Sequence, residues 1–161
     1  MPTIKKDDKR PTFIYNGQPV RAAGILPYTT LNLQKEYLFR WTKKGAGDIG
    51  GKTDETDRDI IDTIVRETTE ETNGKLFTTR SHEILDHILR NEELEIFYCP
   101  KGKYILVKVE LDIAVRKLNM KRFGLKENGA VTNHYYSWTP RVNRQKLHPR
   151  LKFHTEYNKI F

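Results

Sequence analysis

The chain has little of what marks several classes of protein. Cys99 is its only cysteine, so neither an internal disulfide nor a cysteine-rich zinc site is possible. Its uncharged apolar stretches are too short to span a bilayer, and the opening residues MPTIKKDDKR lack the apolar run of a secretory signal. We therefore expect an intracellular, cytoplasmic protein with no membrane partner.

Acidic residues are scarce in the last third of the chain. Residues 101–161 carry 14 Lys and Arg against 4 Asp and Glu, a net charge of +10, whereas residues 1–100 carry 15 against 17, a net charge of −2. This asymmetry favours a polyanionic partner such as a nucleotide, RNA or an inositol polyphosphate. The alternative is that the charge serves solubility, and composition does not separate the two.

The length of 161 residues, with 37% hydrophobic and 31% charged residues, indicates one soluble domain over residues 1–161. Residues 1–12 are charged and contain prolines, so we expect a flexible arm there. Residues 141–161 are expected to form a basic C-terminal extension that ends in a short helix.

Strands and helices alternate in the predicted order of elements. Apolar patterning predicts strands over residues 18–30, 36–44 and 133–140, and a hairpin over 94–111 that turns at Pro100–Lys103. Helices are predicted from an N-cap at Thr56 to a stop at Asn73-Gly74, and over residues 81–91. The order predicts an α/β (α+β) sandwich in which a mixed central sheet lies between helices.

The first predicted helix carries three carboxylates near its C-terminal end. Glu67, Glu70 and Glu71 fall within an arc of roughly 100° beside the apolar stripe. Like charges at i,i+4 destabilise a helix slightly, and a cation would remove that penalty. Three carboxylates without nearby thiols or imidazoles form a hard oxygen set suited to Mg²⁺ or Mn²⁺, although an acidic solvated helix face is the simpler interpretation of the helix alone.

The residues before this helix favour the metal-binding interpretation. Gly50-Gly51-Lys52 is expected to form a loop that turns sharply, approaches a ligand closely and offers a carbonyl oxygen as a further hard ligand. A glycine-rich loop, a capped helix and carboxylates three and four residues apart have one joint explanation, which is a cation held over a phosphate chain.

The stretch from Gly51 to Gly74 resembles the signature of the Nudix hydrolase family. That signature is glycine, five residues, glutamate, seven residues, Arg-Glu, an apolar residue, any residue, Glu-Glu, any residue, glycine and an apolar residue. This chain matches it in identity at Gly51, Arg66, Glu67, Glu70 and Glu71.

The chain departs from the signature at Asp57, Thr68 and Asn73. Asp57 stands in place of the first glutamate, and eight residues separate it from Arg66 where the family has seven. Thr68 replaces the apolar residue and Asn73 replaces the glycine. A shift of one residue would rotate Asp57 by about 100° on a helix, away from the position of the first glutamate of the signature.

The resemblance implies the fold of the family and Mg²⁺-dependent attack of water on a diphosphate linkage, in a nucleoside diphosphate derivative. It implies that Glu67, Glu70 and Glu71 hold the metal, assisted by a carbonyl of Gly50 or Gly51. Arg66 would pair with a carboxylate and fix the helix against the loop. The general base would be Glu67 or Glu70, or a glutamate outside the signature (Glu93, Glu95 or Glu127).

Substrate contacts are predicted from charge and aromatic character. Lys52, Arg40, Lys43 and Lys44 flank the glycines and are candidates for phosphate contacts, against the alternative of ordinary surface charge. Four aromatic residues are candidates for stacking on a nucleobase, and the alternative is that they pack in the core. They are Trp41, Tyr135, Tyr136 and Trp138.

Two further functions fit the sequence. Hydrolysis at the 5′ end of RNA, including cap removal, or of a diphosphoinositol polyphosphate, would use the basic last third. A nucleotide-binding or RNA-binding module that kept the fold without the chemistry would explain the departures at Asp57 and Asn73. The intact glutamates argue against this last possibility, because a binding module has no reason to keep clustered like charges.

Overall fold

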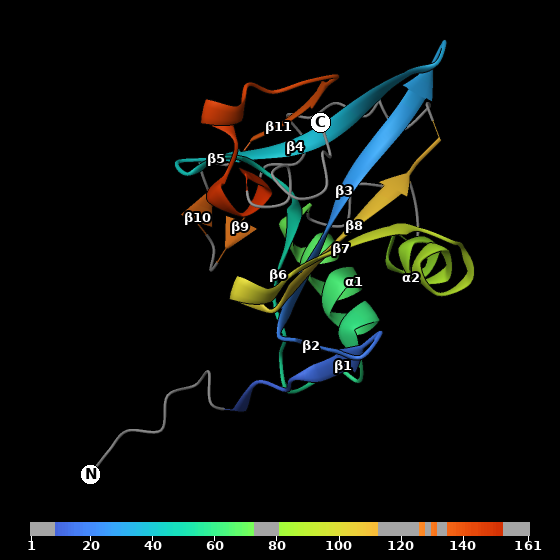
Figure 1. The fold of residues 1–161 in the computed structure, drawn as a ribbon, viewed down its shortest axis with the longest axis vertical. Coiled ribbons are helices and arrows are strands. Elements are labelled where there is room, and N and C mark those ends of the chain that lie inside the picture. Colours follow the sequence, from blue (N-terminus) through green and yellow to red (C-terminus); the bar gives the residue numbers. More distant parts are fainter. Residues whose placement is uncertain (1–8, 73–80, 113–125, 128–129, 132–134, 153–161) are drawn as a thin grey trace.

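The computed structural model describes residues 9–72, 81–112, 126–127, 130–131 and 135–152. Most of its residues lie in one twisted sheet and two helices (Figure 1). The helices are α1 (Ile60–Glu71) and α2 (Ser81–Asn91). The strands are β1 (Phe13–Tyr15), β2 (Gln18–Val20), β3 (Ala22–Leu31), β4 (Gln34–Thr42), β5 (Gly45–Gly47), β6 (Ile49–Lys52), β7 (Glu95–Cys99), β8 (Tyr104–Glu110), β9 (Lys126–Glu127), β10 (Ala130–Val131) and β11 (Tyr135–Thr139).

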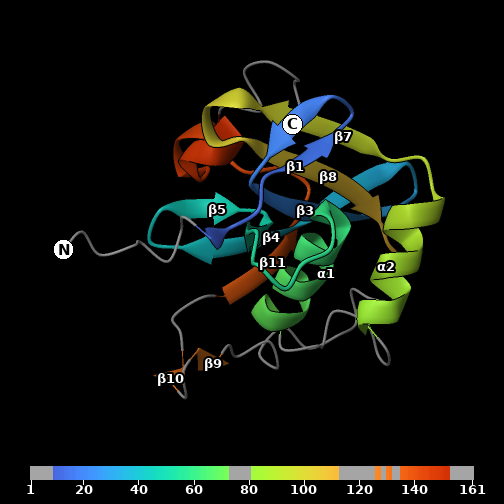
Figure 2. The same cartoon turned by 90° about the horizontal axis from the view of Figure 1, so that it is seen from below.

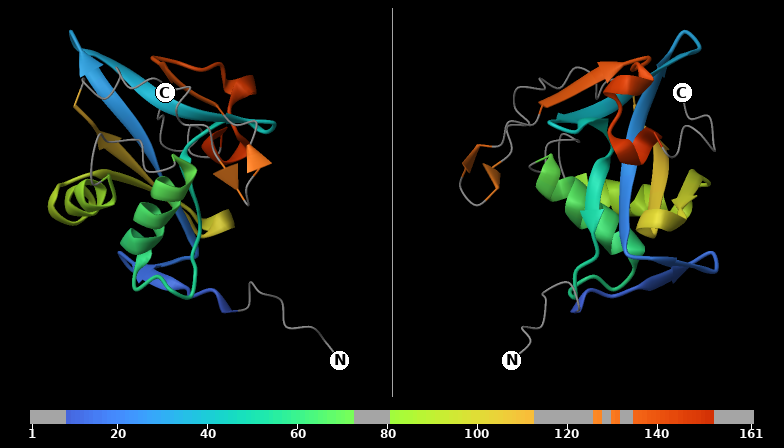
Figure 3. Two further views of the ribbon diagram at one scale, coloured as in Figure 1. Left: turned by 180° about the vertical axis from the view of Figure 1, so that it is seen from behind. Right: turned by 60° about the vertical axis from the view of Figure 1, so that its left-hand side comes forward.

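The main sheet is mixed, as predicted. Its order is β11-β4-β3-β8-β7, with β5 paired to β4 and β6 paired to β3. The β3–β8 pairing is parallel and the other pairings are antiparallel. The β1–β2 hairpin and the β9–β10 ribbon are separate two-stranded sheets, and the ribbon stands apart from the main sheet in the right-hand view of Figure 3.

The two faces of the sheet bury different sets of side chains. On one face, Ile25, Leu38 and Val107 pack with residues of α1 and α2, which lie side by side (Figure 2). On the other face, Leu26, Phe39 and Leu106 pack against the segment after β11, through the buried side chains Val142, Leu147 and Leu151. The mixed α+β fold is therefore confirmed.

The covering of the second face begins with an extended chain. Residues 142–152 run across it with a 3₁₀ turn at Arg144–Lys146, and a helical stretch begins at Pro149. A bridge between Leu147 and Ala46 of β5 places this segment beside the glycine-rich strands. The described part of the predicted C-terminal extension, residues 141–152, thus contributes buried side chains to the core.

The first helix begins later than the sequence predicts. Its N-cap is Asp59, whose carboxylate accepts a hydrogen bond from the Asp62 N–H, so the expected cap at Thr56 is wrong. Thr56 instead donates its hydroxyl to Asp54 in the preceding turn, at 2.6 Å. The helix is capped at its other end by Thr72, and the predicted stop at Asn73-Gly74 lies outside the described residues.

The stretch Gly50-Gly51-Lys52, expected to be a loop, is part of strand β6. Gly50 and Gly51 pair with Gly24 and Ala23 of β3. Neither Gly50 nor Gly51 has a positive φ. Their small size matters because other side chains pack directly onto them.

Part of the predicted N-terminal arm is attached to the fold. The Pro11 carbonyl accepts a hydrogen bond from the Thr53 hydroxyl at 2.8 Å, and Arg10 donates to the Arg21 carbonyl at 3.4 Å. Residues 1–8 lie outside the described part of the chain. Within the described part, neither helix is long and apolar enough to cross a membrane.

Candidate active site

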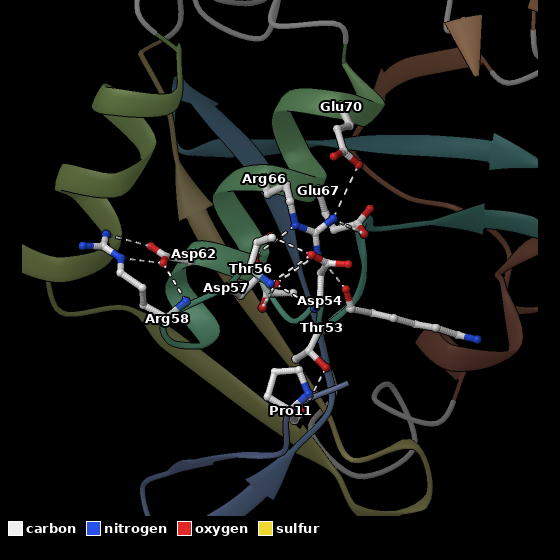
Figure 4. Close-up of polar contacts among 12 residues, drawn as sticks. Pro11, Thr53, Asp54, Thr56, Asp57, Arg58, Asp62, Arg66, Glu67 and Glu70 are labelled. Atoms are coloured by element: carbon white, nitrogen blue, oxygen red, sulfur yellow. Dashed lines mark hydrogen bonds and ion pairs between the residues drawn. The ribbon is translucent and has the colours of Figure 1, made fainter. Parts of the chain in front are cut away.

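An arginine of α1 ties the helix to the preceding turn and to β6. Arg66 donates from Nε and Nη2 to the two carboxylate oxygens of Asp57, each at 3.0 Å, and from Nη2 to the Lys52 carbonyl at 2.8 Å (Figure 4). The Asp57 side chain is 3% exposed and also accepts from the Thr63 hydroxyl and the Asp54 N–H. These hydrogen bonds raise the pKa of Arg66 above its usual value.

The geometry explains why the extra residue after Asp57 is tolerated. Asp57 lies before α1, in the turn that follows β6, so the extra residue does not rotate it around the helix. A fork of two hydrogen bonds between Arg66 and this carboxylate still forms. The predicted pairing of Arg66 with a carboxylate is therefore present.

Two glutamates of α1 converge on the same guanidinium nitrogen. Arg66 Nη1 lies 3.0 Å from Glu67 Oε1 and 3.5 Å from Glu70 Oε2. The Glu67 side chain is 15% exposed and the Glu70 side chain 61% exposed. Burial raises the pKa of Glu67 above its usual value, and Arg66 opposes that shift.

Glu67 packs against the glycine-rich strand. A Cβ atom added to Gly51 would lie 2.4 Å from Glu67 Cδ and 2.6 Å from each of its carboxylate oxygens. Only glycine at this position leaves room for the carboxylate. The predicted proximity of Gly51 and Glu67 is therefore present.

Glu71 faces a different arginine. Its Oε2 lies 3.1 Å from Arg40 Nη2, and its side chain is 10% exposed. The hydroxyl of Tyr136 donates to the Glu71 carbonyl at 2.6 Å, and Tyr136 itself is only 4% exposed. Tyr136 therefore anchors the end of α1 in the core and has no open face for a nucleobase, which corrects its expected role in stacking.

The donor atoms fit a hard cation in chemistry, but they are not gathered around one point. Among the described residues, no group of three or more His, Cys, Asp and Glu side chains is close enough to hold a metal ion. Glu67 and Glu70 share the positive charge of Arg66, and Glu71 shares that of Arg40. Coordination by all three glutamates would require Glu67 and Glu71 to exchange their guanidinium partners for the ion.

A basic pocket of about 460 Å³ adjoins these residues. Three predicted phosphate contacts, Arg40, Lys43 and Lys44, line it together with Gly50. The sequence did not reveal that residues about a hundred positions away complete it. These are His148 and Arg150 of the C-terminal segment.

The remaining predicted contacts line two other hollows, of which the one with Lys52 also contains Arg66 and Glu67. Trp41 and Trp138 share a hollow of about 310 Å³ with Arg141 and Lys146, and Trp41 Nε1 donates to the Ser137 hydroxyl at 2.7 Å. A hollow of about 220 Å³ is lined by Lys52 with the following residues: Lys9, Arg10, Thr53, Asp54, Glu55, Arg66 and Glu67.

Comparisons with known proteins give no close match. No protein-family model and no curated protein matches the chain. A crystal structure of C. elegans Ap4A hydrolase is similar with 21% identity and a TM-score of 0.38, over 75% of this chain and 80% of that chain. A binary complex of C. elegans Ap4A hydrolase is similar with 20% identity and a TM-score of 0.42, over 88% and 89%. The interpretation of the site therefore rests on the contacts described above.

Proposed function

We propose that this chain is a Nudix hydrolase that cleaves a diphosphate linkage in a nucleoside diphosphate derivative. The observation that supports the proposal most is the position of Arg66. It joins Asp57 to the Lys52 carbonyl and holds Glu67 and Glu70 beside the glycine-rich strand. Two of the three glutamates that the resemblance to the family assigns to the metal, Glu67 and Glu70, are thus organised around one guanidinium.

The proposed cofactor is Mg²⁺ or Mn²⁺, with Glu67, Glu70 and Glu71 and a carbonyl of Gly50 or Gly51 as its ligands. Such a cation polarises phosphoryl oxygens and lowers the pKa of bound water. The contribution of the chain is to position these carboxylates. Glu67 is held by Arg66 and by the space above Gly51, whereas Glu70 is exposed to incoming ligand.

A carboxylate substitution tests the proposal. Glu70→Gln keeps the shape of an exposed side chain and removes a carboxylate, so we expect Mg²⁺-dependent hydrolysis to fall by about 100-fold or more. The melting temperature should change little, because the lost ion pair is exposed. The measurement is release of product from a panel of nucleoside diphosphate derivatives.

Glu92→Gln is the matched control, since Glu92 is exposed just beyond α2. It should retain wild-type turnover. Retention of turnover by Glu70→Gln within about twofold would contradict the assignment of the site. Absence of turnover in the wild type across the whole panel would favour the non-catalytic binding module.

The alternative substrates are separated by the same assay. Capped RNA, 5′-triphosphorylated RNA and diphosphoinositol polyphosphates are added to the panel. Preference for long RNA over short dinucleotide analogues, lost on addition of salt, would favour 5′-end hydrolysis. Equal cleavage of short analogues without dependence on salt would exclude it.

A further inference from the structure

The basic pocket combines charges from two distant parts of the chain. One wall is the turn between β4 and β5, with Lys43 and Lys44, and the other is the segment with His148 and Arg150. Lys43 and Lys44 are exposed, and neither has a carboxylate partner within the described part of the chain. Two adjacent uncompensated cations on one wall are a feature expected of a site for anions.

Arg150 is held rigidly at the opposite wall. Its Nε and Nη2 donate to Asp48 Oδ1 at 3.0 and 2.8 Å, and its guanidinium lies 4.2 Å from the centroid of the Tyr104 ring. The Tyr104 hydroxyl also donates to Asp48, whose side chain is fully buried. Asp48 thus binds the Nε and Nη2 edge of the guanidinium, and the Tyr104 ring covers one of its faces. Nη1 has no hydrogen-bond partner among the residues described.

His148 adds a polar group with a defined tautomer. Its Nδ1 accepts a hydrogen bond from the Arg150 N–H at 3.2 Å, so the neutral ring carries its proton on Nε2 as a donor. Burial, followed by the charge of Arg150, lowers the pKa of His148 below its usual value. A bound anion would counteract the second effect.

The pocket borders the candidate active site through two of its lining residues. Gly50 lines the pocket and belongs to the strand whose next residue contacts Glu67. Arg40 lines the pocket and pairs with Glu71 at the end of α1. A phosphate chain placed beside the glutamates would therefore extend toward Lys43, Lys44 and Arg150.

We propose that this pocket binds the phosphate groups of the substrate that lie beyond the cleaved linkage, so that the preferred substrates carry at least three phosphates in a linear chain. The proposal rests on the proposed function for the identity of the substrate. A single diphosphate held at the glutamates would leave the two lysines without a counter-charge, because only Arg150 among these cations has a carboxylate partner, Asp48. A longer chain supplies that counter-charge.

Direct binding of an inorganic anion tests the pocket without hydrolysis. The metal-free, full-length chain is titrated calorimetrically with tripolyphosphate and with orthophosphate at equal ionic strength. We expect tripolyphosphate to bind about tenfold more tightly or better, with an affinity that falls as salt is added. Equal affinity for the two anions would overturn the proposal.

Paired charge removal localises the binding. Lys43→Gln/Lys44→Gln should weaken tripolyphosphate binding about tenfold, because it removes both uncompensated cations. Lys35→Gln/Lys101→Gln removes the same charge from exposed positions outside the pocket and should stay within about twofold of wild type. Equal losses in the two double variants would show diffuse attraction and would overturn the proposal.

Turnover then separates this proposal from the proposed function. In the lysine double variant, KM for a nucleoside triphosphate derivative should rise about tenfold while kcat stays near wild type, because the groups bind and do not react. Normal hydrolysis with an unchanged KM would overturn the pocket and leave the proposed function intact. Specific tripolyphosphate binding by a chain that hydrolyses nothing would support the pocket as a polyphosphate site and overturn the proposed function.

Discussion

Gly51 shows how a single missing side chain positions a charged group. Gly51→Ala would place a Cβ 2.4 Å from Glu67 Cδ, and the obstacle is the far end of a flexible side chain. We expect stability to fall by no more than about 1 kcal/mol, since the carboxylate turns away, but turnover to fall about tenfold or more. Thermal unfolding and kinetics on the same preparation measure the two effects.

Gly102→Ala provides the control for that substitution. Its added Cβ would meet only the Tyr104 Cβ, at 3.7 Å, so both stability and turnover should stay close to wild type. Full activity in Gly51→Ala would indicate that the position of Glu67 is unimportant.

His148 should make stability depend on pH in a defined direction. Its folded-state pKa is lowered, chiefly by burial, so the unfolded chain takes up the proton first as pH falls below about 6.5. The loss of stability due to His148 therefore grows as the pH falls from that value to its folded pKa and stays constant below it, and His148 has no effect above about 6.5. The variant His148→Asn removes the titrating group, and its side-chain oxygen can still accept the hydrogen bond from the Arg150 N–H.

Melting temperatures of the wild type and His148→Asn are compared between pH 8 and pH 5. The wild type should lose stability relative to the variant as the pH falls through about 6.5. Parallel curves over this range would contradict the buried, neutral state of the imidazole.

At the scale of elements, the ion pair between Asp57 and Arg66 helps to join the turn after β6 to α1. Asp57→Asn would remove one carboxylate charge beside Arg66 and keep a side chain of the same shape in the buried position. Breaking a fully buried pair costs about 3–5 kcal/mol. Because the Arg66 side chain is 26% exposed, solvent offsets part of this, and we expect a loss of about 1–3 kcal/mol. Urea unfolding measures it.

A double-mutant cycle assigns this loss to the pair. Arg66→Gln alone should destabilise the chain by a similar amount, and the combined variant should lose much less than the sum of the two. Strictly additive losses would mean that Asp57 and Arg66 act independently.

The sequence predicts those features of α1 that depend only on residues close together in the chain. The spacing of Arg66, Glu67 and Glu70 on one helix follows from the helical repeat alone. The N-cap was misplaced because Thr56 and Asp59 are both good caps, and a tertiary contact favours Asp59, which receives Arg90 of α2 at 2.8 Å.

At the scale of the whole molecule, the C-terminal segment completes both the core and the basic pocket. Leu151 is fully buried against the second face of the sheet. Leu151→Ala should cost about 2–5 kcal/mol and lower the melting temperature by roughly 4–20 °C for a domain of this size. Tripolyphosphate binding should weaken with it, since the neighbouring Arg150 loses its support.

Leu33→Ala is the control, because the Leu33 side chain is 98% exposed. Leucine and alanine at position 33 would adopt the same left-handed backbone conformation. It should leave the melting temperature nearly unchanged. A stable Leu151→Ala variant would mean that the segment is not an integral part of the core.

Long-range pairing accounts for what the sequence could not predict about this site. Asp48 contacts Arg150 across 102 positions, and no local pattern marks either residue as a partner of the other. Similarly, Gly50 and Gly51 suggest a turn from composition, but pairing with β3 makes them extended. The sequence allows Tyr136 to be a stacking residue, but in the fold its side chain is buried in the core.

The sequence by itself determined the mixed order of strands and helices and the carboxylate face of α1, because periodicity and residue spacing act within a few turns of chain. Only the tertiary structure decided that Asp57 meets Arg66, that Glu71 turns to Arg40, and that the C-terminal segment lines a basic pocket. Those contacts form between residues far apart in the sequence, because a buried charge or polar group needs a partner and the packing of the whole core determines which groups lie close enough.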